Sequence, residues 1–182
     1  SLFATFSIKA ARAYYAEFER QQQELPPEKR LKIATIYSYS PNSEDPDTGL
    51  LCEESMDTKA LSADDRAFLD NVIDQYNKEF GTNFGTDPAG FENYYEHLSK
   101  ALATKAVDLV IVVDMFLTGF DSKTLNTLWV DKNLRAHGLI QAFSRTNRIL
   151  NSVKTYGNIV CFRNLEEEVE EAIALFGNKN AR

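Results

Sequence analysis

The segment from Val107 to Val113 (VDLVIVV) constrains the fold more than any other part of this sequence. Its apolar residues do not alternate with polar ones, so both faces of the strand that it predicts must be covered. Such strands lie inside parallel sheets, because parallel strands are joined by long crossovers that are usually helices and cover both faces. The segment therefore predicts an α/β fold.

Strands and helices are predicted to alternate along the rest of the chain. Runs of β-branched and aromatic residues predict further strands, at about 2–6, 31–39, 127–130 and 158–162. Apolar residues at helical spacing predict helices, at about 8–23, 63–80, 89–104, 138–144 and 165–176. This alternation is typical of an open parallel sheet sandwiched by helices.

The 182 residues fit a single domain with one insertion. We expect the helical and loop insertion at about 41–104, since residues 41–61 are polar, acidic and rich in turn formers. The chain starts at Ser1 without a methionine, so we interpret it as a piece of a longer protein. It has no stretch of membrane-span length and no signal-peptide pattern. Cys52 and Cys161 fit no zinc spacing, which predicts free thiols in a reducing, cytoplasmic compartment.

Charge is distributed unevenly along the chain. The net charge of −7 argues against a generic nucleic-acid binder, for which a basic domain is usual. Residues 41–80 carry eleven Asp and Glu against three Lys and Arg, whereas residues 118–163 carry seven Lys and Arg against two Asp and Glu. An acidic protein with a local basic face is therefore possible.

Sites in open parallel sheets form where strands end. The loop after 107–113 runs from Asp114 to Asp121 and contains Thr118 and Gly119. After the strand at 127–130, a helix is expected to carry Gln141, Arg145 and Arg148 on one side. Two guanidinium groups at a strand-end loop suit a polyphosphate. Charge and spacing alone nevertheless favour the ordinary interpretation, in which the arginines are solvated and the loop is a simple turn.

Two of these segments resemble conserved motifs of superfamily 2 helicases. QAFSRTNR is similar to motif VI, with the form Q-x-x-[GS]-R-x-x-R, which is matched by Gln141, Ser144, Arg145 and Arg148. DMFLTGFD is similar to motif V, in which a Gly and a second Asp follow the first Asp by five and seven residues; Asp114, Gly119 and Asp121 match. The two motifs at this spacing are more specific than either alone.

The longer run IVVDMFLTGFDSKTLNTLWVDKNLRAHGLIQAFSRTNR resembles the restriction subunit of type I restriction-modification enzymes. The opening SLFATFSIKAARAYYAEF is similar to the start of that family's second motor domain, where motif IV lies. The resemblance is strong over about 105–163, fair over 1–39 and weak between. It implies a RecA-like helicase C-terminal domain.

The resemblance also implies roles for particular residues. In that family the second motor domain closes over ATP bound to the first, so Arg145 and Arg148 would reach the β- and γ-phosphates as arginine fingers. Gln141 would help to sense the nucleotide, and Gly119 and Asp121 would link the ATP cleft to the DNA track. Further contacts to DNA phosphates are expected from Ser7, Lys9 and Thr118. For Ser7, a simple helix N-cap is the favoured interpretation.

The sequence lacks other parts of such an enzyme. It has no G-x-x-x-x-G-K-[ST] loop and no Asp-Glu pair after an apolar strand to hold Mg²⁺. Both belong to a first RecA-like motor domain, so we expect this chain alone to be inactive and ATP and Mg²⁺ to be held mainly by that domain. A nuclease domain in the same protein, and methylation and specificity subunits beside it, are the other partners that the resemblance implies. Contacts to double-stranded DNA are expected to be made to phosphates and to be independent of sequence.

Several alternatives remain open at this point. Another superfamily 2 helicase or remodeller would share the arginines, and a non-catalytic RecA-like binding module would keep only the fold. Pro46-Asp47 followed by Asp57-Thr58-Lys59 imitates a nuclease signature, but it lies in the acidic loop without a strand scaffold, so we predict no metal site there. His97 and His137 have no partner at metal-ligand spacing.

Overall fold

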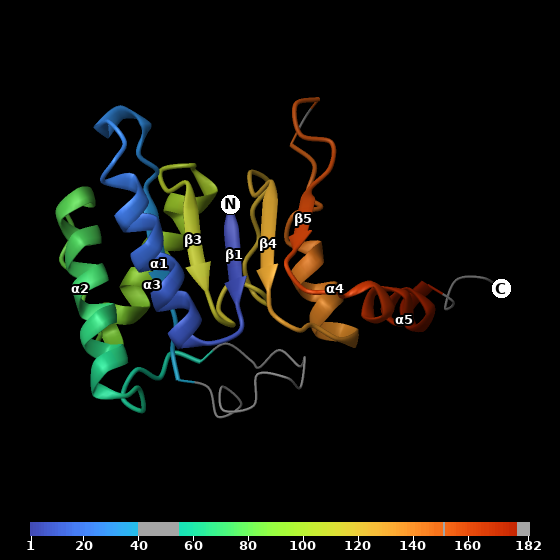
Figure 1. The fold of residues 1–182 in the computed structure, drawn as a ribbon, viewed down its shortest axis with the longest axis horizontal. Helices are drawn as coiled ribbons and strands as arrows, with labels where there is room; N and C mark the ends of the chain where they lie inside the picture. The colour runs from blue at the N-terminus through green and yellow to red at the C-terminus, as the bar shows by residue number, and fades with distance from the viewer. Residues whose placement is uncertain (40–54, 151, 178–182) are drawn as a thin grey trace.

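The computed structural model describes residues 1–39, 55–150 and 152–177 of the chain. Its centre is a five-stranded sheet in which all strands run parallel, in the order β2-β3-β1-β4-β5 (Figure 1). The strands are β1 Leu2–Thr5, β2 Ile33–Ile36, β3 Leu109–Val112, β4 Thr127–Asp131 and β5 Asn158–Cys161. The parallel α/β sheet expected from the sequence is confirmed.

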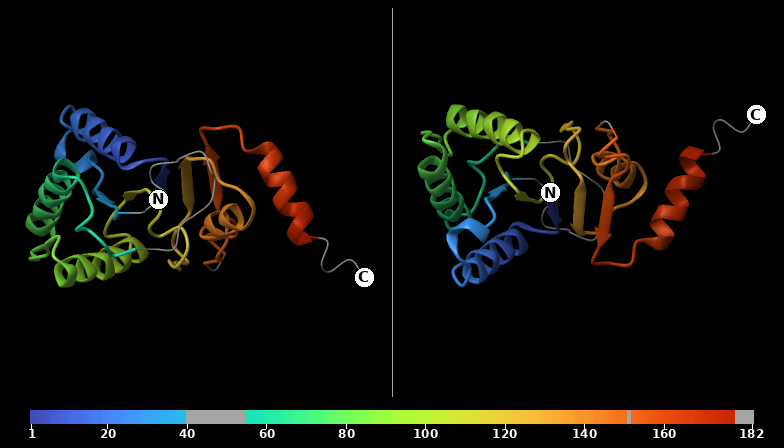
Figure 2. Two further views of the ribbon diagram at one scale, coloured as in Figure 1. Left: turned by 90° about the horizontal axis from the view of Figure 1, so that it is seen from below. Right: turned by 90° about the horizontal axis from the view of Figure 1, so that it is seen from above.

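Helices cover both faces of this sheet. They are α1 Ile8–Gln22, α2 Ala63–Phe80, α3 Pro88–Ala103, α4 Ala136–Ser144 and α5 Glu166–Gly177, with a short 3-10 turn at Pro27–Lys29. Figure 2 shows α1 on one face, α3 and α4 on the other, and α2 beyond the edge formed by β2. This two-faced cover around a parallel sheet is a RecA-like arrangement.

Within the run from Val107 to Val113, Leu109–Val112 form the interior strand β3, as their apolar pattern predicts. β3 lies between β2 and β1, with Ala34 and Leu2 both in register with Val110. The side chains of β3 are buried on both faces of the sheet. Because all strands run the same way, their carboxyl ends meet at one edge, which we call the strand-end edge.

The crossover from β2 to β3 is made by the two helices of the expected insertion. α2 begins at a Ser62 N-cap, whose side chain accepts from the Asp65 N–H, and ends at Gly81, which has a φ of 65°. α3 buries Phe91, Tyr94 and Leu98 completely. The Tyr94 hydroxyl donates to the Thr35 carbonyl at 3.0 Å, so α3 is fixed on the sheet beside β2.

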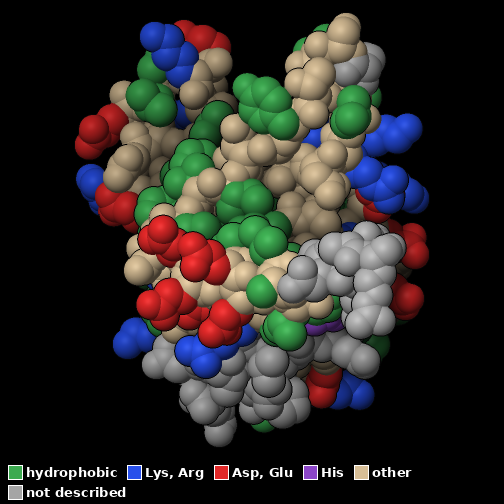
Figure 3. All heavy atoms as spheres, turned by 90° about the vertical axis from the view of Figure 1, so that its right-hand side faces the viewer, with side chains coloured by type: hydrophobic (Ala, Val, Ile, Leu, Met, Phe, Trp, Pro, Cys, Tyr) green, Lys and Arg blue, Asp and Glu red, His purple; other side chains and the backbone are tan. Residues whose placement is uncertain are grey.

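The side of the sheet formed by the outer strand β5 is more open. β5 is the last strand on this side, and three of its four residues are exposed. α5 packs against α4 beyond the sheet (Figure 1). Hydrophobic side chains gather in the middle of this side of the molecule (Figure 3). None of the helices within the described ranges is long and apolar enough to cross a membrane.

Candidate functional site

The loop that carries motif V begins with a buried ion pair. Lys132 Nζ lies 2.5 Å from Asp114 Oδ1 and donates to the Val113 carbonyl at 3.1 Å. The Lys132 and Asp114 side chains are 8% and 14% exposed. Asp114 follows β3 and Lys132 follows β4, so the pair joins these two strand ends across the end of β1. Asp114 was expected after a strand, but no sequence pattern indicated its contact with Lys132.

Aromatic packing fixes the path of the same loop. Phe116 is fully buried, stacks on Tyr95 of α3 with ring centroids 4.8 Å apart and meets Phe120 edge-on at 5.1 Å. The backbone φ of Phe116 is 66°, in the left-handed region that residues other than glycine rarely adopt. Tertiary packing therefore holds a strained backbone position in the middle of motif V.

The structure corrects the expected geometry of motif VI. The sequence suggested that Arg145 and Arg148 share one face of a helix, but α4 ends at Ser144. Arg148 lies in the irregular segment 145–149, which we call the turn after α4. Ser144 Oγ and Arg145 Nε both donate to the Gln141 carbonyl, at 2.7 and 3.0 Å. The backbone N–H groups of residues 145–147 bond three residues back instead of four. Side-chain competition for the last carbonyls thus ends the helix early.

Both arginines nevertheless meet the motif V loop. Arg145 Nη1 donates to the Phe120 carbonyl at 2.6 Å, and this side chain is half-buried. Arg148 Nη2 lies 2.8 Å from Asp121 Oδ2, and both side chains are 55% exposed. Two segments about twenty-five residues apart in sequence are therefore joined by one internal and one surface contact. Thr146 lies beside Gly157, directly before β5, so these contacts are not at the strand-end edge. Gln141 lies one turn earlier in α4 and is half-buried.

The remaining predicted site residues lie after β1 or in the motif V loop. Ser7 caps α1 by accepting from the Ala10 N–H at 3.1 Å, so the N-cap expected for Ser7 is present. Lys9 is exposed in the first turn of α1. Thr118 is half-buried and Gly119 is exposed. Since β1 neighbours β3 and β4, the start of α1 belongs to the strand-end edge.

A cluster at the end of β4 was not predicted from the sequence. The carboxylate of Asp131 accepts from the Tyr14 hydroxyl at 2.9 Å and from Arg163 Nε at 3.1 Å. The Arg163 guanidinium also lies over the Phe6 ring, 4.7 Å from its centroid. Burial and the nearby Asp131 carboxylate raise the pKa of Tyr14, so its hydroxyl stays a donor. The cluster ties α1, β4 and the segment after β5 together. The only sign of this cluster in the sequence was the position of Asp131, directly after an apolar strand segment.

The segment after motif VI also contains residues that the sequence did not single out. Lys154 is buried, and its ammonium donates to the carbonyls of Thr146 and Arg148. Gly157 lies so close to Thr146 that a Cβ on Gly157 would be 2.3 Å from the Thr146 carbonyl oxygen. A lone lysine and a lone glycine in a polar stretch carry no sequence pattern that indicates these contacts.

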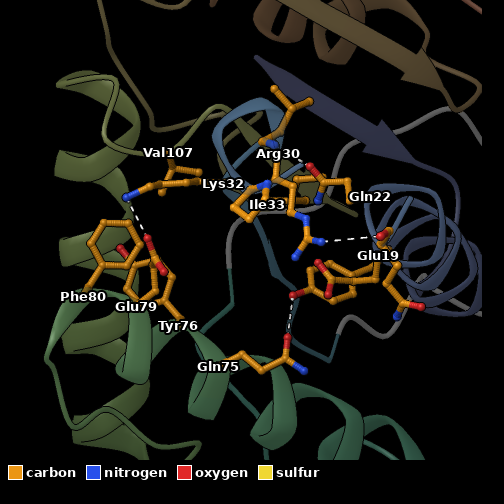
Figure 4. A pocket seen from close by; sticks show the side chains of 14 residues that line it. Glu19, Gln22, Arg30, Lys32, Ile33, Gln75, Tyr76, Glu79, Phe80 and Val107 are labelled. Atoms are coloured by element: carbon orange, nitrogen blue, oxygen red, sulfur yellow. Dashed lines mark hydrogen bonds and ion pairs between the residues drawn. The ribbon is translucent and has the colours of Figure 1, made fainter. Parts of the chain in front are cut away.

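A prominent pocket lies away from these residues. It measures about 390 Å³ and is lined by residues such as Tyr15, Lys32, Glu79 and Val107 (Figure 4). Lys32 and Val107 precede β2 and β3, so this pocket lies at the opposite, amino-end edge of the sheet. Its polar groups are paired within the fold, as in the 2.7 Å contact between Lys32 Nζ and Glu79 Oε1. None of the motif V or motif VI residues lines this pocket, so it is not the site that the motifs define.

Only part of the nuclease-like pattern, residues 57–59, lies among the described residues. Pro46 and Asp47 lie outside the described residues. The Asp57 carboxylate accepts from the Lys59 backbone N–H at 2.8 Å, and Thr58 is buried and donates to the Thr86 carbonyl at 2.7 Å. Within the described part of the chain, no group of three or more His, Cys, Asp or Glu side chains is arranged to hold a metal ion.

The two histidines take packing positions. His97 Nδ1 lies 2.8 Å from the Tyr76 hydroxyl, and its ring packs against Phe80 and Phe84. His137 is in the first turn of α4, where its ring contacts Phe176 of α5 at 5.9 Å between centroids. Neither ring takes part in the contacts between motifs V and VI.

A five-stranded parallel sheet covered by helices on both faces is a RecA-like α/β arrangement, consistent with a helicase C-terminal domain. Residues 1–164 match the family model described as type I restriction enzyme subunit R domain 3. The chain belongs to this family of type I restriction enzyme R subunits.

Curated relatives agree with the family match. An endonuclease subunit of a type I restriction enzyme from Staphylococcus aureus (strain COL) is 42% identical over 184 residues, which cover 99% of this chain and 18% of the relative. A similar subunit from Staphylococcus saprophyticus is 42% identical over 178 residues, 97% of this chain and 18% of the relative. A putative endonuclease subunit, N-terminal part, from Mycoplasma pneumoniae is 58% identical over 65 residues, 36% of this chain and 17% of the relative. The chain thus spans less than a fifth of the length of these relatives.

Proposed function

We propose that this chain is the second motor domain of an ATP-driven double-stranded DNA translocase within a type I restriction endonuclease subunit. The observation that carries the proposal is the contact between Asp121 and Arg148. It places the last arginine of motif VI on the last carboxylate of motif V. A first RecA-like domain facing this contact would complete an ATP site between the two domains.

The exposed pair suits a nucleotide that arrives from outside. Arg148 is held by a carboxylate at a surface where both side chains are 55% exposed, so a phosphate oxygen can replace Asp121 as the guanidinium's partner. A guanidinium placed against the γ-phosphate stabilises the charge that develops during phosphoryl transfer. ATP would supply the transferred phosphoryl group, and Mg²⁺ would be held mainly by the first motor domain.

The other site residues have supporting roles in this proposal. Arg145 is half-buried and bonded to the Phe120 carbonyl, so it couples motif VI to motif V and presents its remaining donors beside Arg148. Gln141 senses the nucleotide from the preceding turn of α4. Gly119 and Asp121 carry the nucleotide state through the loop toward the DNA, where Thr118 and the start of α1 make phosphate contacts.

The proposal extends to the whole enzyme. Translocation by the intact subunit feeds DNA cleavage by a nuclease domain of the same chain, as a type I site-specific deoxyribonuclease in the cytoplasm. Methylation and specificity subunits supply target recognition, while the motor contacts phosphates of any sequence. The family membership and the relatives named as endonuclease subunits support this assignment over other superfamily 2 helicases and remodellers.

Translocation by the intact subunit, assembled with its methylation and specificity subunits, tests the motor assignment. With Arg148→Ala, ATP-dependent displacement of a DNA triplex placed downstream of the target should be lost, while DNA binding is retained. Lys78→Ala, which removes an exposed charge from the last turn of α2, should leave displacement unchanged. Normal displacement by the Arg148 variant would remove the motor assignment and leave a non-catalytic RecA-like binding module as the better description.

The role of the α1 start is tested by Lys9→Ala. Lys9 is exposed beside the Ser7 cap, at the edge where DNA phosphates are proposed to lie. Removing one phosphate contact should weaken binding to all sequences equally and reduce the slope of log affinity against log salt by about 1. The measurement is a salt titration of non-specific DNA binding by the intact subunit, and an unchanged slope would place Lys9 off the DNA track.

A further inference from the structure

A buried lysine, Lys154, forms hydrogen bonds to the backbone of the turn that carries Arg148. After α4 the chain passes through residues 145–149 and then forms a small antiparallel bridge between Leu150 and Lys154. Two backbone hydrogen bonds close this bridge, at 2.9 and 3.1 Å. It turns the Lys154 side chain back toward motif VI, where its Nζ donates to the Thr146 carbonyl at 2.7 Å and to the Arg148 carbonyl.

This arrangement opposes the usual preference of lysine for water. The Lys154 residue is 8% exposed, and the structure shows no ion pair for it among the described residues. Burial lowers the pKa of the Lys154 ammonium. Burying an ammonium that has no carboxylate partner costs free energy, and this cost is offset only where the ammonium donates hydrogen bonds. Here the two carbonyls that accept them belong to the turn carrying Arg148.

A second observation shows that this turn is fixed from another side. Gly157 approaches Thr146 so closely that a Cβ would lie 2.3 Å from the Thr146 carbonyl oxygen and 2.4 Å from the Thr146 Cβ. Contacts below 3.0 Å are essentially never made by real Cβ atoms, so a side chain at residue 157 would push the turn away. Lys154 and Gly157 therefore define the position of the same few backbone atoms.

We propose that Lys154 is a positioning residue for Arg148. By holding the carbonyls of residues 146 and 148, it fixes the backbone from which the Arg148 side chain extends toward Asp121 and, in the assembled motor, toward the γ-phosphate. The inference rests on the proposed function, because it assigns Lys154 a part in ATP hydrolysis through Arg148. Lys154 itself touches neither nucleotide nor DNA in this scheme.

The geometry explains why such a device is needed here. α4 ends at Ser144, so Arg148 is not part of a helix. An exposed turn without further contacts would leave the position of its guanidinium unrestrained. The surface pair with Asp121 is weak, since both partners are 55% exposed. A misplacement of about 1 Å at a catalytic group can cost roughly 10²-fold in rate, so a fixed backbone matters for an arginine that stabilises a transition state.

The experiment is a double-mutant cycle in the intact subunit, measured as DNA-stimulated ATP hydrolysis. Lys154→Met keeps most of the length and the apolar character of the stem but removes all three donors. It should lower kcat by roughly 10- to 10²-fold with the KM for ATP changed by a few-fold at most. Lys78→Met is the matched control, because it removes an exposed ammonium far from this turn. Circular dichroism and binding of a non-hydrolysable ATP analogue report whether each variant is folded.

The cycle decides whether Lys154 acts through Arg148. In an Arg148→Ala background, Lys154→Met should cause no further loss of kcat, since the group that it positions is gone. Losses that multiply in the double variant would show a separate structural effect and overturn the inference. So would a normal kcat in the folded single variant.

A second variant covers the case in which Lys154→Met fails to fold. Lys154→Gln retains an amide donor that can reach one of the two carbonyls, and kcat between those of the wild type and Arg148→Ala is expected. Wild-type kcat for folded Lys154→Gln would contradict the inference. If Arg148→Ala itself hydrolyses ATP normally, the proposed function fails; if only the Lys154 variants are normal, the inference alone fails.

Discussion

Alanine in place of Arg148 is expected to slow single-turnover ATP hydrolysis by the intact, DNA-bound subunit by about 10³-fold or more. An arginine that stabilises the transferring phosphoryl group acts in the transition state, so the loss should fall on the rate constant and not on ATP affinity. Rapid-quench measurement of hydrolysis, together with equilibrium binding of a non-hydrolysable analogue, separates the two quantities.

A matched surface arginine provides the control. Arg20 forms an exposed ion pair with Glu17 at 2.7 Å, with side chains 60% and 50% exposed, which resembles the setting of Arg148. Arg20→Ala should leave the hydrolysis rate unchanged. Arg148→Lys keeps the charge but not the planar fork, so it should recover only a small part of the lost rate. Similar rates for the Arg148 and Arg20 variants would show that Arg148 is an ordinary surface residue.

The second large effect is expected in stability, at the buried pair of Lys132 and Asp114. Lys132→Met leaves a carboxylate that is only 14% exposed without its partner. Breaking one side of a buried ion pair costs about 3–5 kcal/mol, because the remaining charge is neither solvated nor compensated. Hydrogen exchange of β3 and β4 amides in the intact subunit should therefore show a free energy of opening lowered by this amount.

A double replacement tests the cause of that loss. Lys132→Met combined with Asp114→Leu removes both charges and keeps much of the buried volume, so protection of β3 and β4 should largely return. Lys123→Met is a suitable control, since Lys123 is exposed in the same region. If the double variant is as unstable as the single one, lost packing and not an unpaired carboxylate is responsible.

Most of the fold was predictable because its signals are local. The apolar run in β3, the Ser62 cap of α2 and the Pro88 start of α3 each act on neighbouring residues, and the corresponding elements begin and end within a few residues of their predicted bounds. The observed order of the strands depends instead on contacts between distant segments, for which a single sequence carries no comparable local signal.

The site was predictable as a set of residues but not as a geometry. The spacing of the motifs brought Arg145 and Arg148 together with Asp121, and the structure places them in contact through separate backbone and side-chain partners. The sequence could not show that α4 ends at Ser144, because Ser144 and Arg145 compete for a carbonyl that a longer helix would have used. The contacts of Lys154 are set by the turn itself, so they were equally invisible.

The two ion pairs of the motif V loop differ in how they respond to their surroundings. The pair of Asp114 and Lys132 is shielded from solvent, whereas that of Asp121 and Arg148 is open to it. Dissolved salt screens exposed charges strongly and buried ones much less. Rising ionic strength, or an approaching anion, therefore loosens Arg148 from its carboxylate while the loop beneath keeps its shape. The loop thus has one ion pair that persists in salt and one that opens, so Arg148 can exchange partners without the loop refolding.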